Sequence, residues 1–316
     1  MSTMMKTFTT LTAAAAVLLA ANSANAADLQ AKTKTVEVPP PPSMFDIAFG
    51  AALSSNYLFR GISQSDNQPS VSAYFEPRLN FTPNFQAYLG IAGASIDFPN
   101  RAAAEIDLYG GIRPTFGKLA LDIGGIYYWY PGGECYNYNF DGVAYSQVPG
   151  CTLEFNKYGV ATLAKEDASF FEVYGKANLA LTDAFSIGAN IYYTDSYVNT
   201  GAEGIYYSGV AKYVFPSFAN GVGVYVSGEV GYQDLGTTDD FYGYVSLPSY
   251  TTWNAGIGFT YKVFTLDLRY SDTDLSKTDC YLITGDFGAN DLGQSKWCGA
   301  TFLAKLSVDL TLDSLK

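Results

Sequence analysis

The clearest pattern in the sequence is a strict alternation of apolar and polar residues over positions 69–81. Every second residue from Pro69 to Phe81 is apolar, whereas Glu76 and Arg78 fall in the intervening set. A period of two places the two sets on opposite faces of one β-strand. The stretch is longer than the about 9–11 residues that a tilted strand needs to cross a bilayer. We interpret it as a strand between lipid and a wet lumen, although a long hairpin of a soluble β-sandwich would show the same alternation.

The same alternation recurs along the chain and predicts strands over residues 45–57, 69–81, 85–97, 104–116, 119–130, 170–181, 185–194, 206–215, 222–233, 250–261, 264–271 and 300–310. The connections between these twelve strands alternate between long polar loops and tight turns. Outer-membrane barrels have this arrangement, with short periplasmic turns and longer extracellular loops. A soluble β-domain has no physical reason to place its long connections at one end and its short connections at the other. We therefore predict an all-β fold, a single-chain antiparallel up-and-down transmembrane β-barrel in which the first strand pairs with the last.

The N-terminal residues predict export. Residues 1–26 resemble a signal peptide, with Lys6, an apolar stretch over 11–21 that is too short to span a bilayer, and an Ala-Asn-Ala cleavage site. Residues 27–44 include four consecutive prolines and are expected to form a flexible Pro-rich periplasmic leader. The barrel then covers residues 45–316. A mean hydropathy of +0.04 predicts no helical membrane bundle. Together these features predict the outer membrane of a Gram-negative bacterium.

Four cysteines follow the predicted signal peptide: Cys135, Cys151, Cys280 and Cys298. An even number of cysteines in an exported chain indicates two disulfides, and four cysteines allow three pairings. We predict the two local bonds, Cys135–Cys151 and Cys280–Cys298, each within one long outer loop. A metal site is the weaker interpretation, because the spacing does not fit one and the sequence contains no histidine.

The absence of histidine also limits the possible chemistry. Hydrolytic sites that use an imidazole as general base cannot form. Glu105 and Asp107 share one strand face and could form an acid/base pair, but a hydrated lumen wall is the interpretation that we favour. The formal net charge of −12 argues against a nucleic-acid partner. We therefore predict a protein that is not an enzyme and that has no cofactor, no metal and no bound nucleic acid.

The charged residues on the predicted inward faces are the candidate pore-lining residues. The acids are Asp46, Glu76, Glu105, Asp107, Asp122, Glu172, Glu229, Asp267 and Asp309, and the bases are Arg78, Arg113, Lys176, Lys212, Arg269 and Lys305. Nine carboxylates against six bases give this wall a net charge of −3. Fixed charges act over one Debye length, about 8 Å at physiological salt. A narrow lumen with this wall should therefore favour small cations weakly.

One segment also resembles a known family. The stretch from Ser54 to Glu76, and above all its part NYLFRGISQSDNQP, is similar to the opening hairpin of the TorF family of proteobacterial outer-membrane porins. Beyond that segment, the resemblance rests on the barrel-like pattern over most of the mature chain. It implies an outer-membrane β-barrel with a pore role, and it assigns no function to individual residues.

The predicted barrel leaves two functions open. Barrels of eight strands are filled by side chains, and barrels of about sixteen strands hold an aqueous channel. We predict a porin-like channel for passive diffusion of small hydrophilic solutes or ions, narrowed further if the loop at 131–168 folds inward. The alternative is a non-conducting surface barrel whose loops bind a partner or lipopolysaccharide. In both cases the outer-membrane lipid and lipopolysaccharide surround the protein, and the oligomeric state is left open.

We predict that the purified protein hydrolyses neither phospholipids nor peptides, because no imidazole is available as a general base. The measurements are fatty-acid release from phospholipid vesicles and cleavage of a mixed peptide pool. Turnover that disappears on a single change such as Glu105→Gln would contradict the prediction and reveal a carboxylate-based site.

Overall fold

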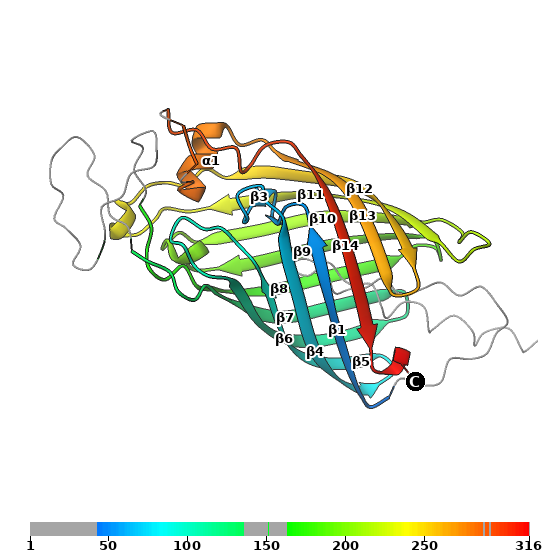
Figure 1. The fold of residues 1–316 in the computed structure, drawn as a ribbon. Coiled ribbons are helices and arrows are strands. Elements are labelled where there is room, and N and C mark those ends of the chain that lie inside the picture. The colour runs from blue at the N-terminus through cyan, green and yellow to red at the C-terminus, as the bar shows by residue number, and fades with distance from the viewer. Residues whose placement is uncertain (1–42, 136–150, 152–162, 287, 291, 316) are drawn as a thin grey trace, which may run out of the picture.

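The computed structural model describes residues 43–135, 151, 163–286, 288–290 and 292–315. Twelve antiparallel strands close into one barrel (Figure 1). The barrel strands are β1 (Phe45–Ser54), β4 (Ser70–Thr82), β5 (Phe85–Ala94), β6 (Glu105–Phe116), β7 (Leu119–Trp129), β8 (Phe170–Ala180), β9 (Phe185–Thr194), β10 (Gly204–Val214), β11 (Gly223–Leu235), β12 (Tyr250–Tyr261), β13 (Phe264–Thr273) and β14 (Thr301–Thr311). A separate two-stranded hairpin consists of β2 (Leu58–Phe59) and β3 (Ile62–Ser63).

The twelve predicted strands are confirmed, with ends that shift by a few residues. Each barrel strand pairs with its neighbours along the chain, and β1 closes the ring by pairing with β14. In this closing pair Phe49 lies opposite Leu310, so the first and last strands run antiparallel as predicted. The predicted signal peptide, nearly all of the predicted leader and most of the loop at 131–168 lie outside the described residues. The expectations for those segments stay predictions.

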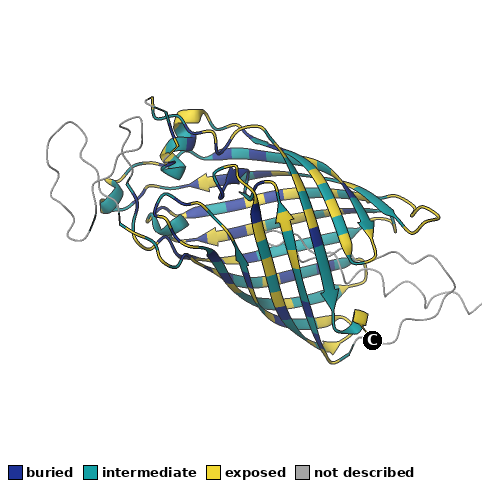
Figure 2. Ribbon diagram, viewed as in Figure 1, coloured by how far each residue is buried: buried dark blue, intermediate teal, exposed yellow. Residues whose placement is uncertain are grey.

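The alternation of the sequence separates an outer face from an interior (Figure 2). On the outer face, Leu89 is 71% exposed and Phe302 is 82% exposed. On the inner face, Glu76 and Asp122 are 2% and 1% exposed. In hydrocarbon every backbone polar group needs a partner within the protein, and a closed ring of strands supplies one. The exposed apolar side chains therefore form the surface that meets lipid.

The long connections enclose an aromatic cluster at one end of the barrel. Phe98 stacks on Tyr130 with ring centroids 4.7 Å apart, and Tyr128 stacks on Phe170 at 4.6 Å. Trp297, from the loop before β14, is 5% exposed and belongs to the same cluster. Aromatic pairs in these arrangements contribute about 0.5–1.5 kcal/mol beyond their buried area. The loops at this end are therefore packed against the strand ends.

A helix and two disulfides stabilise the same loops. Helix α1 (Lys277–Thr284) begins after Ser276, whose hydroxyl caps the helix by accepting from the Asp279 backbone N–H at 3.1 Å. As predicted, Cys280 bonds to Cys298, and Cys135 bonds to Cys151. Within the described residues, no helix is long and apolar enough to cross a bilayer.

Two predicted loops contain elements that the sequence pattern did not predict. The loop at 58–68 forms the hairpin β2–β3, whose strands of two residues are too short to show a period of two. The loop at 272–299 contains α1, which Gly285 ends in a left-handed conformation, with φ +61°. A segment with only two turns of helix gives a weak periodic signal. The hairpin and the helix could therefore be recognised only in the three-dimensional structure.

We predict that Leu89→Arg destabilises the barrel and that Asn190→Arg does so much less. Leu89 lies near the middle of β5 and faces outward, whereas Asn190 lies near the middle of β9 and borders an internal cavity. An arginine on the lipid face near the bilayer midplane lowers the free energy of unfolding by about 2–4 kcal/mol. Urea unfolding in lipid vesicles measures this difference. Equal losses in the two variants would contradict the assignment of the faces.

Candidate functional site

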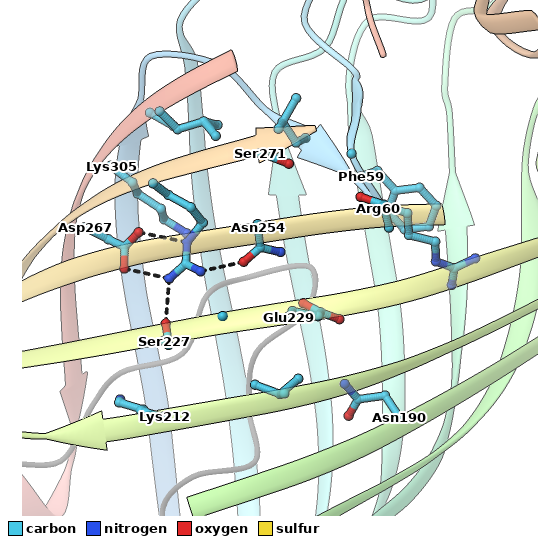
Figure 3. Close-up of a pocket in the computed structure, with 18 of the residues that line it drawn as sticks. Phe59, Arg60, Asn190, Lys212, Ser227, Glu229, Asn254, Asp267, Ser271 and Lys305 are labelled. Carbon is cyan, nitrogen blue, oxygen red and sulfur yellow. Dashed lines mark hydrogen bonds and ion pairs between the residues drawn. The ribbon is translucent and has the colours of Figure 1, made fainter. Parts of the chain in front are cut away.

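The first outer loop folds back into the barrel. At the tip of the hairpin, Arg60 contacts Glu172 of β8 and Gln233 of β11. The backbone carbonyl oxygen of Arg60 accepts a hydrogen bond from the Tyr250 hydroxyl of β12 at 3.2 Å. These strands lie on different parts of the ring, so the hairpin lies inside it (Figures 1 and 3). The loop that the sequence analysis treated as an ordinary polar connection narrows the lumen.

Arg60 is held by charge, hydrogen bonds and aromatic rings. Its Nη2 forms an ion pair with Glu172 Oε2 at 2.7 Å, and its Nη1 donates to Gln233 Oε1 at 2.8 Å. Its guanidinium carbon lies 4.5, 5.0 and 4.6 Å from the ring centroids of Phe59, Tyr192 and Tyr206. Arginine is suited to such a site because it can stack on rings and pair with a carboxylate at the same time. This set of contacts fixes the hairpin tip.

The turn of the hairpin depends on backbone conformation. Arg60 and Gly61 have φ angles of +49° and +83°, the left-handed region at both central positions of the turn. A Cβ atom on Gly61 would overlap Thr252 of β12 and Thr273 of β13. Glycine at this position therefore allows both the tight turn and the close approach of the hairpin to the barrel wall.

Polar side chains anchor the base of the hairpin. Asn56 Oδ1 accepts hydrogen bonds from Ser63 Oγ at 2.8 Å and from Ser65 Oγ at 3.1 Å. On the outer side, Trp297 Nε1 donates to Asp66 Oδ1 at 2.7 Å. Buried polar groups are stable only when they are paired in this way. The hairpin is thus part of the folded core beneath the outer loops.

One wall of the barrel carries a network of paired charges. Glu76 Oε1 accepts from Arg78 Nε at 2.6 Å and from Arg113 Nη1 at 2.8 Å. Arg113 Nε reaches Asp122 Oδ2 at 3.2 Å, and the Tyr88 hydroxyl donates to the other oxygen of Asp122 at 2.5 Å. The guanidinium of Arg113 also lies 3.6 Å from the Tyr88 ring centroid. The carboxylates of this wall are therefore neutralised by neighbouring arginines.

The predicted carboxylate pair lies among tyrosines. Glu105 accepts hydrogen bonds from Tyr57 and, at 2.8 Å, from Tyr130. Burial, together with the charges of Glu105 and Asp107, raises the pKa of Tyr57 well above its ordinary value, so this phenol stays a donor. Asp107 is 3% exposed, and its Oδ1 has no hydrogen-bond partner among the described residues. Neither Glu105 nor Asp107 borders the internal cavity that is described next.

A cavity of about 340 Å³ lies between the hairpin and the barrel wall, to which β8 to β14 contribute most and β1, β4 and β5 contribute Ser54, Ser70, Ser72 and Ala94 (Figure 3). Its charged lining consists of Arg60, Lys176, Lys212, Glu229, Asp267, Arg269 and Lys305. Asparagine and serine side chains, including Asn190, Asn254 and Ser227, make up much of the remaining lining. The cavity is therefore hydrophilic and has more basic than acidic groups around it.

The predicted pore-lining residues divide into two groups. Six of them border the cavity: Lys176, Lys212, Glu229, Asp267, Arg269 and Lys305. The other nine lie elsewhere in the barrel: Asp46, Glu76, Arg78, Glu105, Asp107, Arg113, Asp122, Glu172 and Asp309. Six of the nine predicted acids are buried, with Asp46 the most exposed of the six at 7%, whereas the six predicted bases are all half-buried. The fifteen predicted charges therefore differ in their burial, and their pore-lining role stays a prediction.

The hairpin residues and the amides were not among the residues predicted to form the site. Arg60, Tyr57, Gln233, Asn190 and Asn254 all contact the lumen network or the cavity. A local signal exists for Arg60, because the pair Arg60-Gly61 is flanked by apolar residues on both sides, as in a tight hairpin. The uncharged residues give no such signal, since the analysis of the inward faces considered only charges.

We predict that Arg60→Ala lowers the free energy of unfolding by about 3–5 kcal/mol, because it leaves Glu172 buried without a counter-charge. The double variant Arg60→Ala/Glu172→Gln should recover a large part of that loss. Urea unfolding of all four members of the cycle measures the coupling between the two residues. Additive losses would show that the ion pair does not hold the hairpin.

Several solved structures of outer-membrane proteins resemble this chain at low sequence identity. The NanC porin is 9% identical, with a TM-score of 0.43 over 84% of this chain and 100% of that chain. An outer membrane channel from Pseudomonas putida F1 is 10% identical, with a TM-score of 0.40 over 89% and 100%. LpxR from Salmonella typhimurium is 8% identical, with a TM-score of 0.41 over 83% and 99%. Likenesses with TM-scores below 0.5 carry no argument about this chain.

A family model gives the informative match. No curated protein matches the sequence. Residues 39–302 match a model described as a bacterial protein of unknown function (Gcw_chp), and this range includes the hairpin and eleven complete barrel strands. The TorF resemblance stays an expectation, because this model has another name. The chain therefore belongs to the Gcw_chp family of bacterial proteins of unknown function.

Proposed function

We propose that the protein is a passive diffusion channel of the bacterial outer membrane for small hydrophilic solutes or ions. The observation that carries this proposal is the hydrophilic cavity of about 340 Å³ inside a closed barrel. Apolar side chains such as Leu89 and Phe302 cover the outside, and a closed ring separates polar solutes from hydrocarbon. The ion pairs inside the barrel stabilise the wall and the hairpin, but the open hydrophilic space beside them is what a polar solute needs to pass, so transport is the function that it supports best.

The hairpin β2–β3 is the proposed constriction. It occupies the outer half of the lumen and borders the cavity through Tyr57 to Gly61. Because Arg60 and Gly61 pack against β8, β11, β12 and β13, a solute has to pass beside the hairpin along the remaining wall. The sequence analysis assigned a narrowing role to the loop at 131–168, most of which lies outside the described residues.

The proposal does not retain the weak cation preference. That preference was based on nine acids against six bases, each counted as accessible. Glu76, Glu105, Asp107, Asp122 and Glu172 are each at most 3% exposed, and their charges are engaged by arginines and phenols or lie away from the cavity. A cation preference therefore stays a prediction from the sequence, and the burial of these acids weighs against it.

A non-conducting surface barrel is the second candidate. The aromatic cluster of Phe59, Phe98, Tyr128, Tyr130 and Phe170 fills part of the outer end, and this observation favours a plugged lumen. In that case the outer loops would bind a partner or lipopolysaccharide. Neither candidate involves a chemical reaction, and the absence of enzymatic activity stays a prediction from the sequence.

We predict that the purified protein forms ion-conducting channels in planar bilayers and that removing the hairpin enlarges them. Replacing residues 58–63 by two glycines should raise the single-channel conductance severalfold, because the hairpin fills part of the lumen. Single-channel recording in potassium chloride measures the conductance of each protein.

The matched control shortens another outer connection, residues 240–244, whose members do not border the cavity. Its conductance should equal that of the wild type. Silent bilayers with both the wild type and the hairpin deletion, from folded protein, would reject the channel and favour the surface barrel.

A further inference from the structure

We propose that the cavity beside the hairpin binds a small hydroxylated organic anion, with a carboxylate or phosphate as its charged group. This inference rests on the proposed channel for its biological setting and gives that channel a solute class. The binding site itself is argued from the contacts of the cavity wall. The proposed ligand is an anion, whereas the count of inward-facing charges in the sequence favoured a small cation.

The charge that faces the cavity is positive once internal ion pairs are set aside. Arg60 is paired with Glu172, and Arg269 is paired with Asp267. Lys212 is also engaged and is therefore not counted. The charged lining that remains is Lys176 and Lys305 against Glu229, an excess of one positive charge. A concave site with low-dielectric walls strengthens such a local field. The cavity should therefore attract anions.

Asp267 is held by Arg269 and forms no hydrogen bond or ion pair with the nearby Lys305. Both of its carboxylate oxygens accept from Arg269, each at 3.0 Å, and Oδ2 also accepts from the Tyr225 hydroxyl at 2.7 Å. Arg269 in turn donates to Asn254 at 2.6 Å and to Ser227 at 2.9 Å, so its guanidinium is fixed in place. Lys305 stands opposite Asp267 in the pairing of β13 and β14. Its ammonium makes no hydrogen bond or ion pair with any residue that the structure describes.

Lys176 shows the same feature on the other side of the cavity. Its ammonium lies 4.5 Å from the Tyr174 ring centroid and 5.4 Å from that of Tyr192. Among residues 43–135, 151, 163–286, 288–290 and 292–315, no acceptor forms a hydrogen bond or an ion pair with it. Partly buried ammonium groups are ordinarily paired, because loss of water without a partner is unfavourable. Two such lysines on one cavity indicate a ligand that supplies the negative charge.

The uncharged lining indicates hydroxyl groups on the ligand. Asn190 Nδ2 donates to Ser208 Oγ at 3.0 Å, and its amide oxygen accepts no hydrogen bond from a described residue. Asn178, Ser186 and Ser271 also border the cavity. Amides and hydroxyls both donate and accept, so they suit a polyol better than an apolar ligand. The volume of about 340 Å³ is at the lower end of ligand sites, which span about 300–1,000 Å³, and favours a molecule of monosaccharide size.

Glucuronate, glucose 6-phosphate and glucose are matched probes, because they share one ring and differ in charge. Binding to the purified full-length protein is measured by calorimetry in detergent, and block of the potassium chloride current is measured in planar bilayers. At about 0.1 M salt the Debye length is about 10 Å, so charges in the cavity are still felt. We expect binding and block by one or both anions and neither by glucose, and the stronger anion identifies the charged group.

The test variants are Lys176→Gln and Lys305→Gln, alone and combined. The combined variant should raise the dissociation constant of the preferred anion about tenfold or more, because it removes two charge-assisted contacts. Lys176→Arg/Lys305→Arg should keep most of the affinity and shows that the barrel tolerates change at both positions. Lys118→Gln, at the exposed turn between β6 and β7, removes the same charge away from the cavity and should change nothing.

The outcomes separate the two proposals. A conducting channel that treats glucose and glucuronate alike, or whose anion affinity is equal in Lys118→Gln and the double glutamine variant, overturns the anion site and leaves the channel. Saturable anion binding that depends on Lys176 and Lys305, in a protein that never conducts, overturns the channel and keeps the site. Absence of both conductance and anion binding overturns both.

Discussion

A strand that crosses hydrocarbon must bond its backbone N–H and C=O groups to other strands, because lipid offers neither donors nor acceptors. The pairing of β1 with β14 meets this requirement by removing the free edges of the sheet. Once the ring is closed, the pleat gives each strand one face toward lipid and one toward the lumen. A shift by one residue would exchange the two faces, so the alternation of the sequence also fixes the register. The polar residues are thereby confined to a small interior.

Within that interior, ion pairs divide the charged side chains into a paired group and a group that faces the cavity. Arg78 and Arg113 neutralise acids on β4 and β7, and Arg60 adds a third guanidinium from the first loop. Lys176 on β8 and Lys305 on β14 form no ion pair with a described residue and border the cavity instead. One wall therefore contains a network of internal ion pairs, and the other presents basic side chains to the cavity. This asymmetry arises only when the barrel folds, because acids and bases are intermixed along the sequence.

The sequence was sufficient for the strands, the order of long and short connections, the closure and both disulfides. These features are repeated or local, so many residues contribute to each signal. It was insufficient for the hairpin and for the accessibility of the charges. Arg60 and Glu172 are separated by 112 residues, and no local pattern relates them. An inward position on a strand also does not reveal whether a carboxylate borders the cavity, as Glu229 does, or is paired with nearby arginines, as Glu76 is.

The partners of the hairpin also determine when it can take its place. Arg60 belongs to the first loop, but Glu172, Tyr192, Tyr206, Gln233 and Tyr250 that surround it come from strands much later in the chain. These contacts cannot exist until β8 to β12 have assembled around the loop. Contacts between such distant segments also form slowly, because the loop-closure entropy has to be lost first. Assembly of this barrel therefore passes through a stage in which the ring is largely built while the first loop is still outside its final site, and insertion of Arg60 is a late step.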